Sequence, residues 1–268
     1  MECVVNESDI LLNRQTREQL RVVAATALAV LPVGSTEQHG PHLPVGTDTF
    51  AVEAVARRAA LAVAAQIRIV VAPTLPFGSS QHHLPFGGTM SLGTETYYRV
   101  IVDLVASLIG SGFRRVLVLN GHGGNQELVE LAVRDLALKH PVALGAAPYW
   151  RIAESALTAA AMPAVPRLPG HAGAFETSLV MALAPEFILE PRPHRARESW
   201  EISPVRSGIR REYAGTWQRM DGYTDSPDLA TAEAGAAYLE AIVGAVGAAF
   251  VDFYHDAGTV VATPAAER

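Results

Sequence analysis

The stretch GSTEQHGPHLPVGTD, residues 34–48, most constrains this chain, because it places Glu37, His39, His42 and Asp48 within 15 positions. It directly follows TALAVLPV, an apolar run with the length and β-branched content of a buried strand. Open α/β sheets bind their ligands beyond the carboxyl ends of such strands. Glu37 and His39 point the same way in an extended chain, and the Gly/Pro-rich loop can fold Asp48 back over them. We interpret the stretch as half of a metal site; the alternative is an irregular, solvated loop.

A second polar cluster, NGHGGN at residues 120–125, directly follows another apolar run, RRVLVL. Parallel strands deliver the side chains that follow them to one edge of a sheet, so His122 is expected beside the first cluster. Glycines allow positive φ, and we expect the loop to wrap tightly and to present the amides of Gly123 and Gly124 to a ligand. A Rossmann-type phosphate loop is rejected because the spacing is wrong and a histidine stands where the backbone should approach the pyrophosphate. A plain glycine-rich turn is the alternative.

Apolar periodicity predicts alternating strands and helices along the rest of the chain. Strands are expected at 27–33, 67–73, 114–119 and 141–148, and helices at 16–25, 49–66, 94–112, 125–139 and 228–256. Alternating strands and helices of this kind favour an α/β fold. The chain shows no repeats and no internal linker. We therefore predict one domain over residues 1–268, a layered α/β/α domain with a mostly parallel central sheet.

The loop at 75–93 leaves the carboxyl end of a strand and is too long and too Gly/Pro-rich for a simple connection. Its adjacent His82 and His83 are expected to face the same crevice, with His83 as a substrate contact; a structural excursion of the chain is the alternative. Farther along, PYWRIAE brings Tyr149 and Trp150 to the same edge. Aromatic rings there can sandwich a flat substrate, although Tyr and Trp are equally common as half-buried rim residues.

GHAGAFETSLVMAL, residues 170–183, is expected to turn from a loop into a helix, with His171 and Glu176 near its start. A carboxylate there can simply cap the helix, because the amino end of a helix favours negative charge. The candidate ligands of the chain combine imidazole and carboxylate groups, which suit Zn²⁺, Mn²⁺ or Fe²⁺ better than Mg²⁺ or Ca²⁺. They are Glu37, His39, Asp48, His122 and Glu176. Three carboxylates and one hydroxide balance the charge of two divalent ions, so two metal ions are predicted.

The composition of the chain argues against nucleic acid and membranes as binding partners. A net charge of −6 and a pI near 5.8, without a basic stripe, leave no electrostatic footprint for nucleic acid. We read no apolar run that approaches the length of a membrane span, and the N-terminal MECVVNESDILLNRQ lacks the basic start and apolar core of a signal peptide. The single cysteine, Cys3, suits a reducing compartment. We expect a cytoplasmic protein that contacts neither nucleic acid nor membrane.

Four segments, GSTEQHGPHLPVGTD, SSQHHLPFGGTMSLG, VLNGHGGN and GHAGAFETSL, together resemble the creatininase (creatinine amidohydrolase) family and occur in its usual order. That family includes creatininase, a deformylase of a formylaminopyrimidine nucleotide and a peptidase that trims the mycofactocin precursor. The resemblance implies a metal-dependent hydrolase of a non-peptide or cyclic amide or formamide C–N bond. Two divalent metal ions, Zn²⁺ before Mn²⁺ or Fe²⁺, would share a bridging hydroxide. The resemblance also implies a small-molecule amide substrate and a homo-oligomer, since relatives form hexamers.

The resemblance further assigns roles to single residues. Glu37 and His122 would hold the first metal ion and His39 the second, and Asp48 would bridge both. His171, which binds no metal in this assignment, would carry the proton to the leaving nitrogen. Backbone amides of the loop after His122 would stabilise the oxyanion that forms on the substrate.

Two positions depart from the family pattern. Creatininase carries a metal-binding glutamate where this chain has Gly124, and a substrate-contacting tryptophan where it has Arg167. Glu176 is the expected replacement for the missing ligand, as a metal-binding and catalytic carboxylate, and Gly124→Glu is expected to restore the family arrangement in part. Arg167, as a substrate contact, favours a more polar or anionic substrate than creatinine. The alternatives are a mycofactocin-precursor-type peptidase, creatininase proper, or a non-catalytic metal-binding scaffold protein with the inherited fold.

Overall fold

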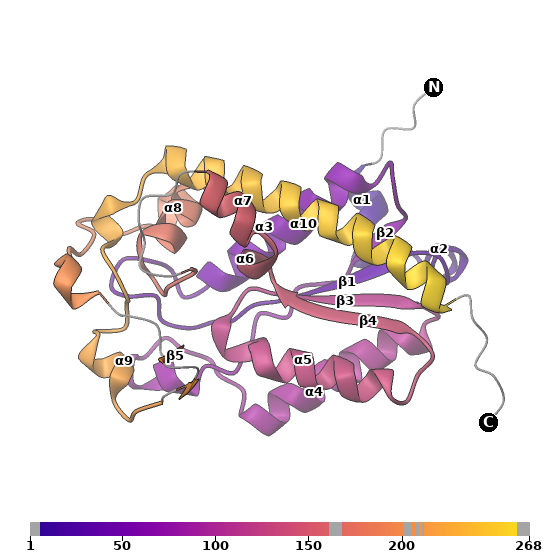
Figure 1. Cartoon of the computed structure of the whole chain (residues 1–268), viewed down its shortest axis with the longest axis horizontal. Coiled ribbons are helices and arrows are strands. Elements are labelled where there is room, and N and C mark those ends of the chain that lie inside the picture. The colour runs from indigo at the N-terminus through magenta and orange to yellow at the C-terminus, as the bar shows by residue number, and fades with distance from the viewer. Residues whose placement is uncertain (1–5, 161–167, 201–204, 207–208, 211, 262–268) are drawn as a thin grey trace.

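The structure is a computed structural model that describes residues 6–160, 168–200, 205–206, 209–210 and 212–261. Four parallel strands form its central sheet in the order β2-β1-β3-β4 (Figure 1). Their bounds are β1 Leu28–Val33, β2 Ile69–Val71, β3 Arg115–Asn120 and β4 Ala143–Pro148. Each strand lies within its predicted segment or extends one residue beyond it. The predicted α/β fold class with a parallel sheet is confirmed.

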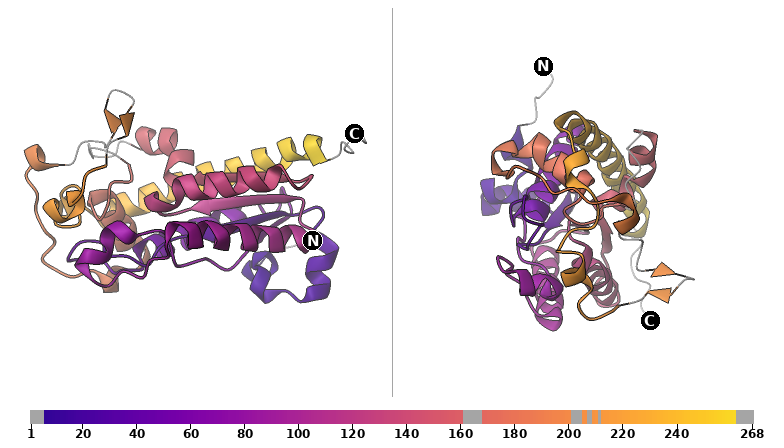
Figure 2. Two further views of the ribbon diagram at one scale, coloured as in Figure 1. Left: turned by 90° about the horizontal axis from the view of Figure 1, so that it is seen from below. Right: turned by 90° about the vertical axis from the view of Figure 1, so that its left-hand side faces the viewer.

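Helices cover both faces of this sheet in two layers (Figures 1 and 2). One layer contains α3 (Thr47–Val63), α6 (Tyr149–Ile152), α7 (Glu154–Ala159), α8 (Ala174–Leu183) and α10 (Ala232–Val261). The other contains α4 (Thr94–Gly110) and α5 (Gln126–Ala137), which pack against each other. Shorter elements are α1 (Glu7–Ile10), α2 (Arg17–Val23), α9 (Thr216–Arg219) and the antiparallel pair β5 (Val205–Arg206) and β6 (Ile209–Arg210).

Side chains of β1 alternate between the two layers. Leu28 and Val30 belong to the core beside α3 and α10, whereas Ala29, Leu31 and Val33 belong to the core beside α4 and α5. Every residue of this strand is buried, as expected for a parallel sheet that is covered on both faces. Polar functional side chains therefore have to come from the segments beyond the strand ends.

The closing helix α10 is more apolar than the sequence prediction allowed. Its stretch Ala232–Ala257 has 26 residues and contains an 18-residue window with a mean hydropathy of 1.7, which is long and apolar enough for a membrane span by length and composition alone. The expectation that no run approaches this length is therefore wrong. The helix packs along α3 and α8, and its Ile242, Val246 and Phe250 are fully buried in the core. Packing within this fold accounts for the apolar composition of that face.

Two local differences from the prediction affect the functional end of the sheet. Helix α3 begins at Thr47, so Asp48 lies in its first turn and not in the loop before it. A carboxylate in a first turn is favoured by the helix dipole and is held by a rigid backbone. The loop at 75–93 contains a 3₁₀ helix, Gln81–Phe86, which carries His82 and His83. Both differences place candidate side chains on regular backbone.

Candidate metal centre

The candidate site lies at the edge of the sheet where the strand order reverses. β1 and β3 are adjacent and parallel, and Val33 is paired with Asn120, so the loops after them leave the sheet at the same level. A reversal of this kind opens a crevice beyond the strand ends. The loops after β1 and β3, together with the first turns of α3 and α8, bring the predicted ligands into this crevice. They are Glu37, His39, His122, Asp48 and Glu176.

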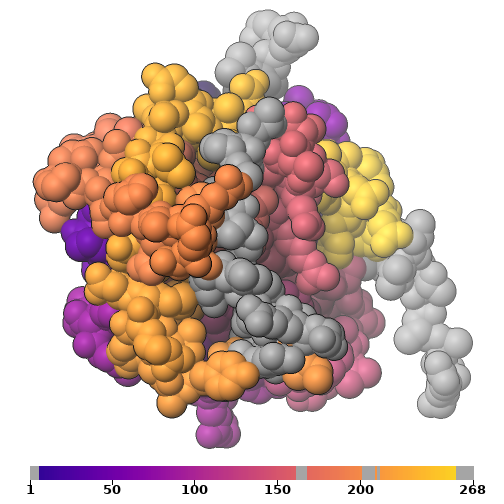
Figure 3. All heavy atoms as spheres, turned by 60° about the vertical axis from the view of Figure 1, so that its left-hand side comes forward, coloured from indigo at the N-terminus to yellow at the C-terminus, as the bar shows by residue number. Residues whose placement is uncertain are grey.

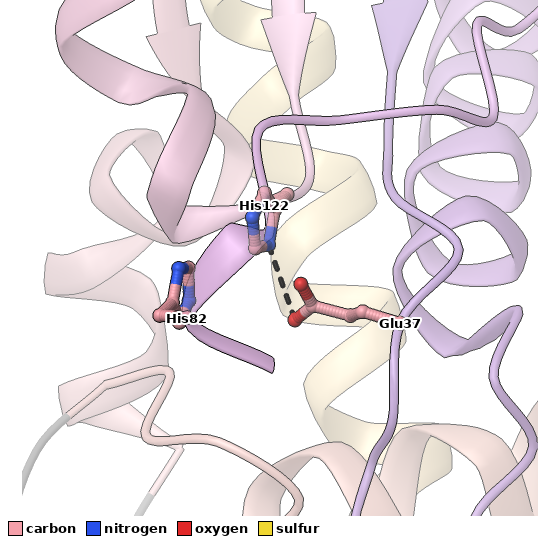
Figure 4. Close-up of side chains that lie close together, drawn as sticks. All are labelled: Glu37, His82 and His122. Atoms are coloured by element: carbon pink, nitrogen blue, oxygen red, sulfur yellow. Dashed lines mark ion pairs between the residues drawn. The ribbon is translucent and has the colours of Figure 1, made fainter. Parts of the chain in front are cut away.

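The five side chains form two groups that share Asp48. In the first group, His122 Nδ1 lies 3.0 Å from Asp48 Oδ2 and 3.3 Å from Glu37 Oε1. Figure 4 shows the side chains of Glu37 and His122 pointing toward each other. In the second group, His39 Nε2 lies 3.2 Å from Asp48 Oδ1 and 3.7 Å from Glu176 Oε2. Ligands bound tetrahedrally at zinc distances lie about 3.3 Å apart. The separations therefore fit two ions, with one oxygen of Asp48 facing each.

Burial supports the same interpretation. All five side chains are buried, and Glu37 and His39 are fully so. Among the described residues, Glu37 Oε1, His39 Nε2 and Asp48 Oδ2 are buried atoms that make no hydrogen bond of acceptable geometry. Buried polar atoms without partners are costly, by about 1–3 kcal/mol each. One ligand atom from each of these three residues lies within 4.8 Å of the others, so cations held by the two groups would satisfy the buried atoms.

Each ligand histidine is oriented by its second nitrogen. His39 Nδ1 lies 3.1 Å from the backbone oxygen of Glu37, and His122 Nε2 lies 3.3 Å from the backbone oxygen of Ser79. A ring nitrogen that faces a carbonyl oxygen has to carry the proton, which leaves the other nitrogen as a lone-pair donor. Metal-binding histidines are held in this way. The free nitrogens, Nε2 of His39 and Nδ1 of His122, are the two that face the carboxylates.

A buried network joins the three loops behind the first group. Asn125 donates to the backbone oxygen of Gly34 at 3.0 Å and accepts from the amide of Ser79 at 2.9 Å. Ser80 Oγ lies 3.1 Å from His122 Nε2 and 2.6 Å from the hydroxyl of Ser35. The loops after β1, β2 and β3 are therefore tied to one another, which fixes the relative positions of their ligands. Sequence reasoning missed these partners because their contacts span 42 to 91 positions of the chain.

The charges of the site call for cations. Burial disfavours the charged form of His39, but Asp48, Glu176 and Glu37 outweigh burial and raise the pKa of this imidazole to about 10. Burial raises the pKa of Glu176 to about 7. The charge of Asp48 also raises this pKa, whereas that of His39 lowers it. Without metal ions, the nearby carboxylates thus keep the imidazole of His39 protonated, and burial favours a proton on Glu176. Metal binding displaces such protons, because the ligands have to be deprotonated.

His171 and His83, two predicted functional residues, lie beside the ligands and share one partner, Gln38. The amide oxygen of Gln38 accepts from the backbone of Gly40 at 2.9 Å, and its nitrogen donates to the backbone oxygen of Gly222 at 2.9 Å and to His83 Nδ1 at 2.8 Å. His83 therefore carries its proton on Nε2, which lies 3.6 Å from Glu37 Oε1. Burial is the main reason why the pKa of His83 falls to about 3, so its ring is neutral.

His171 has the opposite proton arrangement. Its Nε2 lies 3.0 Å from the backbone oxygen of Gln38 and has to donate there. Its Nδ1, which lies 3.6 Å from Glu37 Oε1, therefore holds a lone pair that faces the ligands. Burial, followed by the neighbouring His39 and His83, lowers the pKa of His171 well below its ordinary value. At the site, His171 can accept a proton and His83 can donate a hydrogen bond.

Gly124 does not behave as the sequence predicted. Within the described residues, neither Gly123 nor Gly124 has a positive φ; both belong to a 3₁₀ turn, Gly123–Asn125. A Cβ on Gly124 would lie 2.3 Å from the backbone oxygen of Ser79 and 2.6 Å from His122 Nε2. The glycine is needed for close approach and not for its φ. The expectation that Gly124→Glu restores a ligand is therefore wrong, because a side chain at this position has no room.

Two predicted substrate contacts are not part of the cluster. Trp150 belongs to the hydrophobic core and packs edge-on against Tyr149 at 5.1 Å, so its burial does not support a substrate contact. Arg167 lies outside the described residues, and its role stays a prediction. Conversely, sequence reasoning gave no role to Gln38 or to Trp217, whose ring lies 4.5 Å from that of His83. Gln38 stands within the first motif, between two ligands, and this position is the signal that could have identified it.

Comparison with known proteins gives this geometry a family. The sequence model of creatininase, described as creatinine amidohydrolase, matches residues 13–250. This chain belongs to the creatininase family. A solved structure of creatinine amidohydrolase (creatininase) superimposes with a TM-score of 0.74 at 26% identity, covering 90% of this chain and 96% of the other. Two further creatininase structures at 26% identity are described as Mn and Zn-Zn forms.

Relatives in sequence differ in what they act on. The mycofactocin precursor peptide peptidase of Mycobacterium ulcerans is 36% identical over 168 residues, and the match covers 61% of each chain. The creatinine amidohydrolase of Pseudomonas putida is 32% identical over 186 residues, which is 63% of this chain and 69% of that protein. The 3-dehydro-scyllo-inosose hydrolase of Thermotoga maritima is 34% identical over 46% of this chain. Membership of the creatininase family therefore leaves the substrate open.

The placement of Glu176 gives a first prediction. Glu176→Gln should weaken the affinity of the second ligand group for its metal ion. The loss should exceed the roughly 10- to 100-fold that follows when a residue that only contacts a metal ligand is changed. The reason is that Glu176 Oε2 faces His39 Nε2, and an amide is a poor ligand. Metal per chain and competition with a chelator measure the effect. Glu233→Gln, which changes an exposed carboxylate in the first turn of α10, is the control.

If Glu176→Gln holds both ions as tightly as the parent protein, the carboxylate only caps α8. Its hydrogen bond of 2.5 Å from the amide of Ala172 would then be its whole function.

Proposed function

We propose that this creatininase-family chain is a metal-dependent hydrolase of a non-peptide or cyclic amide or formamide C–N bond, with two divalent ions in the candidate centre. The observation that carries the proposal is the position of Asp48, whose two carboxylate oxygens face two separate ligand groups at 3.0 and 3.2 Å. Zn²⁺ suits the imidazole and carboxylate donors, and Mn²⁺ or Fe²⁺ can replace it. Three carboxylates and two imidazoles are the expected first ligands.

The protein groups around the ligands have complementary roles in this reaction. When bound, the metal ions would supply an ionised water molecule near neutral pH and would polarise the scissile carbonyl. His171 accepts the proton of the attacking water at Nδ1 and passes it to the leaving nitrogen as the C–N bond breaks. His83 donates a hydrogen bond from Nε2 to the carbonyl oxygen, on which negative charge develops. Gln38 keeps the two imidazoles in these different proton arrangements.

A peptidase is the second candidate, and the similarity to the mycofactocin precursor peptide peptidase favours it. The same residues would then act on a peptide bond, so the catalytic arrangement does not separate the two candidates. Substrate preference separates them. We would assay the metal-loaded protein against formamides, lactams and unblocked and blocked dipeptides under one set of conditions. Hydrolysis of dipeptides alone would replace the first proposal by the second.

Chelation and creatinine turnover give a second prediction. Removing the metal ions should abolish hydrolysis of every amide in the panel, and adding Zn²⁺ or Mn²⁺ should restore it. Metal content is measured by plasma emission in the same samples.

Creatinine should be a poor substrate, because this chain has Arg167 where creatininase has its substrate-contacting tryptophan. Turnover of creatinine near the roughly 10 per second of a typical native substrate would contradict this expectation.

If the protein holds metal but hydrolyses nothing in the panel, the scaffold alternative gains support. The homo-oligomeric state and the cytoplasmic location stay predictions, as does the expectation that nucleic acid and membranes are not partners.

A further inference from the structure

Trp217 makes ring contacts with three histidines beside the candidate ligands. Its ring centroid lies 4.5 Å from that of His83, 5.1 Å from that of His171 and 5.4 Å from that of His82. It comes from α9, far along the chain from the ligand loops. Figure 3 shows the neighbouring orange and gold segments covering this end of the molecule.

The position of Trp217 is fixed by specific contacts of its segment. The backbone oxygen of Gly222 accepts a 2.9 Å hydrogen bond from the side-chain nitrogen of Gln38, which also donates to His83 Nδ1 at 2.8 Å. A Cβ on Gly222 would lie 2.5 Å from Gln38 Oε1, so the segment is in close contact with the first motif. Helix α9 also packs on the 3₁₀ helix that carries His82 and His83. Trp217 is therefore held at the site and does not merely lie near it.

A gradient of burial places Trp217 on the solvent side. Glu37 and His39 are fully buried, and His83 and His171 are 1% and 6% exposed. His82 and Trp217 are both partly exposed. These two rings therefore lie nearer to solvent than the rings of His83 and His171. Figure 4 shows the ring of His82 beside that of His122, with Glu37 on the other side of His122.

The rings form one continuous surface. His82 and His83 lie 4.2 Å apart, and His83 is stacked on His171 at 4.2 Å with an interplanar angle of 14°. Trp217 meets the rings of His83 and His171 edge-on, at 63° and 76°. Offset and edge-on contacts of this kind are the favoured geometries for aromatic pairs. A flat group inserted here would find ring faces and edges beside the reacting carbonyl.

We propose that Trp217, with His82 and His83, forms an aromatic wall that binds a flat, unsaturated group next to the scissile amide and so selects the substrate. The wall rests on the proposed function, because its place is defined by the metal centre. It adds a specificity-determining residue, and it assigns to the substrate an aromatic or other planar group next to the scissile amide.

Two hydroxamates test the wall without turnover. Benzohydroxamate and acetohydroxamate share the same metal-binding group and differ in the planar ring. Titration calorimetry of the metal-loaded protein should show tighter binding of benzohydroxamate. Trp217→Ala and Trp217→Leu should each lower the ratio of the two affinities by about two- to tenfold, the range of one aromatic contact. Trp217→Phe should keep most of the ratio.

The matched control is Tyr213→Ala, which removes an exposed aromatic ring four positions earlier in the same segment. It should leave the affinity ratio unchanged, and metal content should equal that of the parent in all variants. An unchanged ratio in Trp217→Ala and Trp217→Leu, with metal bound, would overturn the wall while leaving the metal centre in place. Failure of the parent protein to retain metal or to bind either hydroxamate would instead overturn the proposed function, and the wall with it.

Discussion

Asp48→Ala is expected to remove both metal ions and to reduce amide hydrolysis to background. One carboxylate serves both ligand groups, with Oδ2 3.0 Å from His122 Nδ1 and Oδ1 3.2 Å from His39 Nε2. After truncation, each group would keep one imidazole and one carboxylate, which is short of the three protein ligands typical of catalytic zinc sites. His39 and His122 would also lose the carboxylate that both of them face. Metal per chain, measured by plasma emission, is the direct readout.

Two comparisons make the Asp48 result specific. Glu95→Ala changes a carboxylate in the first turn of α4, the same position that Asp48 occupies in α3, but Glu95 is exposed and pairs with Arg99. It should retain both ions. His39→Ala should empty chiefly the second group, because the carboxylates that His39 Nε2 faces most closely are those of Asp48 and Glu176. Full metal loading of Asp48→Ala would show that the carboxylate does not bridge two ions.

His171→Asn is expected to lower kcat by about 10²- to 10⁴-fold while both metal ions stay bound. His171 differs from the nearby His83 in which ring nitrogen carries the proton. His171 exposes a lone pair on Nδ1, because its Nε2 donates to the backbone of Gln38. His83 exposes a proton on Nε2, because its Nδ1 accepts from the side chain of Gln38. Only the first arrangement can accept a proton from water. His255→Asn, at an exposed position in α10, is the control.

The pH profile provides a check on His171 that a purely structural role would not produce. Burial, followed by the neighbouring His39 and His83, lowers the pKa of His171 well below its ordinary value of 6.5. The neutral, proton-accepting form therefore persists below pH 6.5, and the acid limb of kcat/KM that reports this group should lie below that value. The limb should be absent from the residual activity of His171→Asn. A limb of unchanged position in the variant would assign it to another group.

Much of the fold and the ligand set could be predicted from the sequence, because both depend on local patterns. A buried strand followed by a polar loop is visible in TALAVLPV and GSTEQHGPHLPVGTD, and parallel strands deliver such loops to one edge. The polar types in these motifs, together with Glu176, already restricted the chemistry to imidazole and carboxylate ligands. The start of α3 was misplaced by two residues, since a helix boundary depends on tertiary contacts as well as on sequence signals.

Some errors arose because single residues were interpreted without their packing. Gly124 was read as a flexible position into which a carboxylate could be restored, whereas Ser79 and His122 fill the space that its side chain would need. Trp150 was interpreted as a substrate contact, and its ring is packed in the core. The apolar length of α10 was underestimated. In each case the missing information was which surface lies opposite the residue, and a sequence pattern does not contain it.

By itself, the sequence determined which chemical groups are available and at which strand ends they gather, because ligand type and strand periodicity are properties of short segments. Only the tertiary structure decided which atoms face one another. Contacts between distant parts of the chain place Asp48 between two ligand groups. They also set the opposite proton positions of His83 and His171 and place Trp217 over these two rings. The hydrogen bond from Gln38 to Gly222 spans 184 positions. Such contacts form only when the whole chain packs, since burial removes water as the competing partner and makes every polar atom depend on its neighbours.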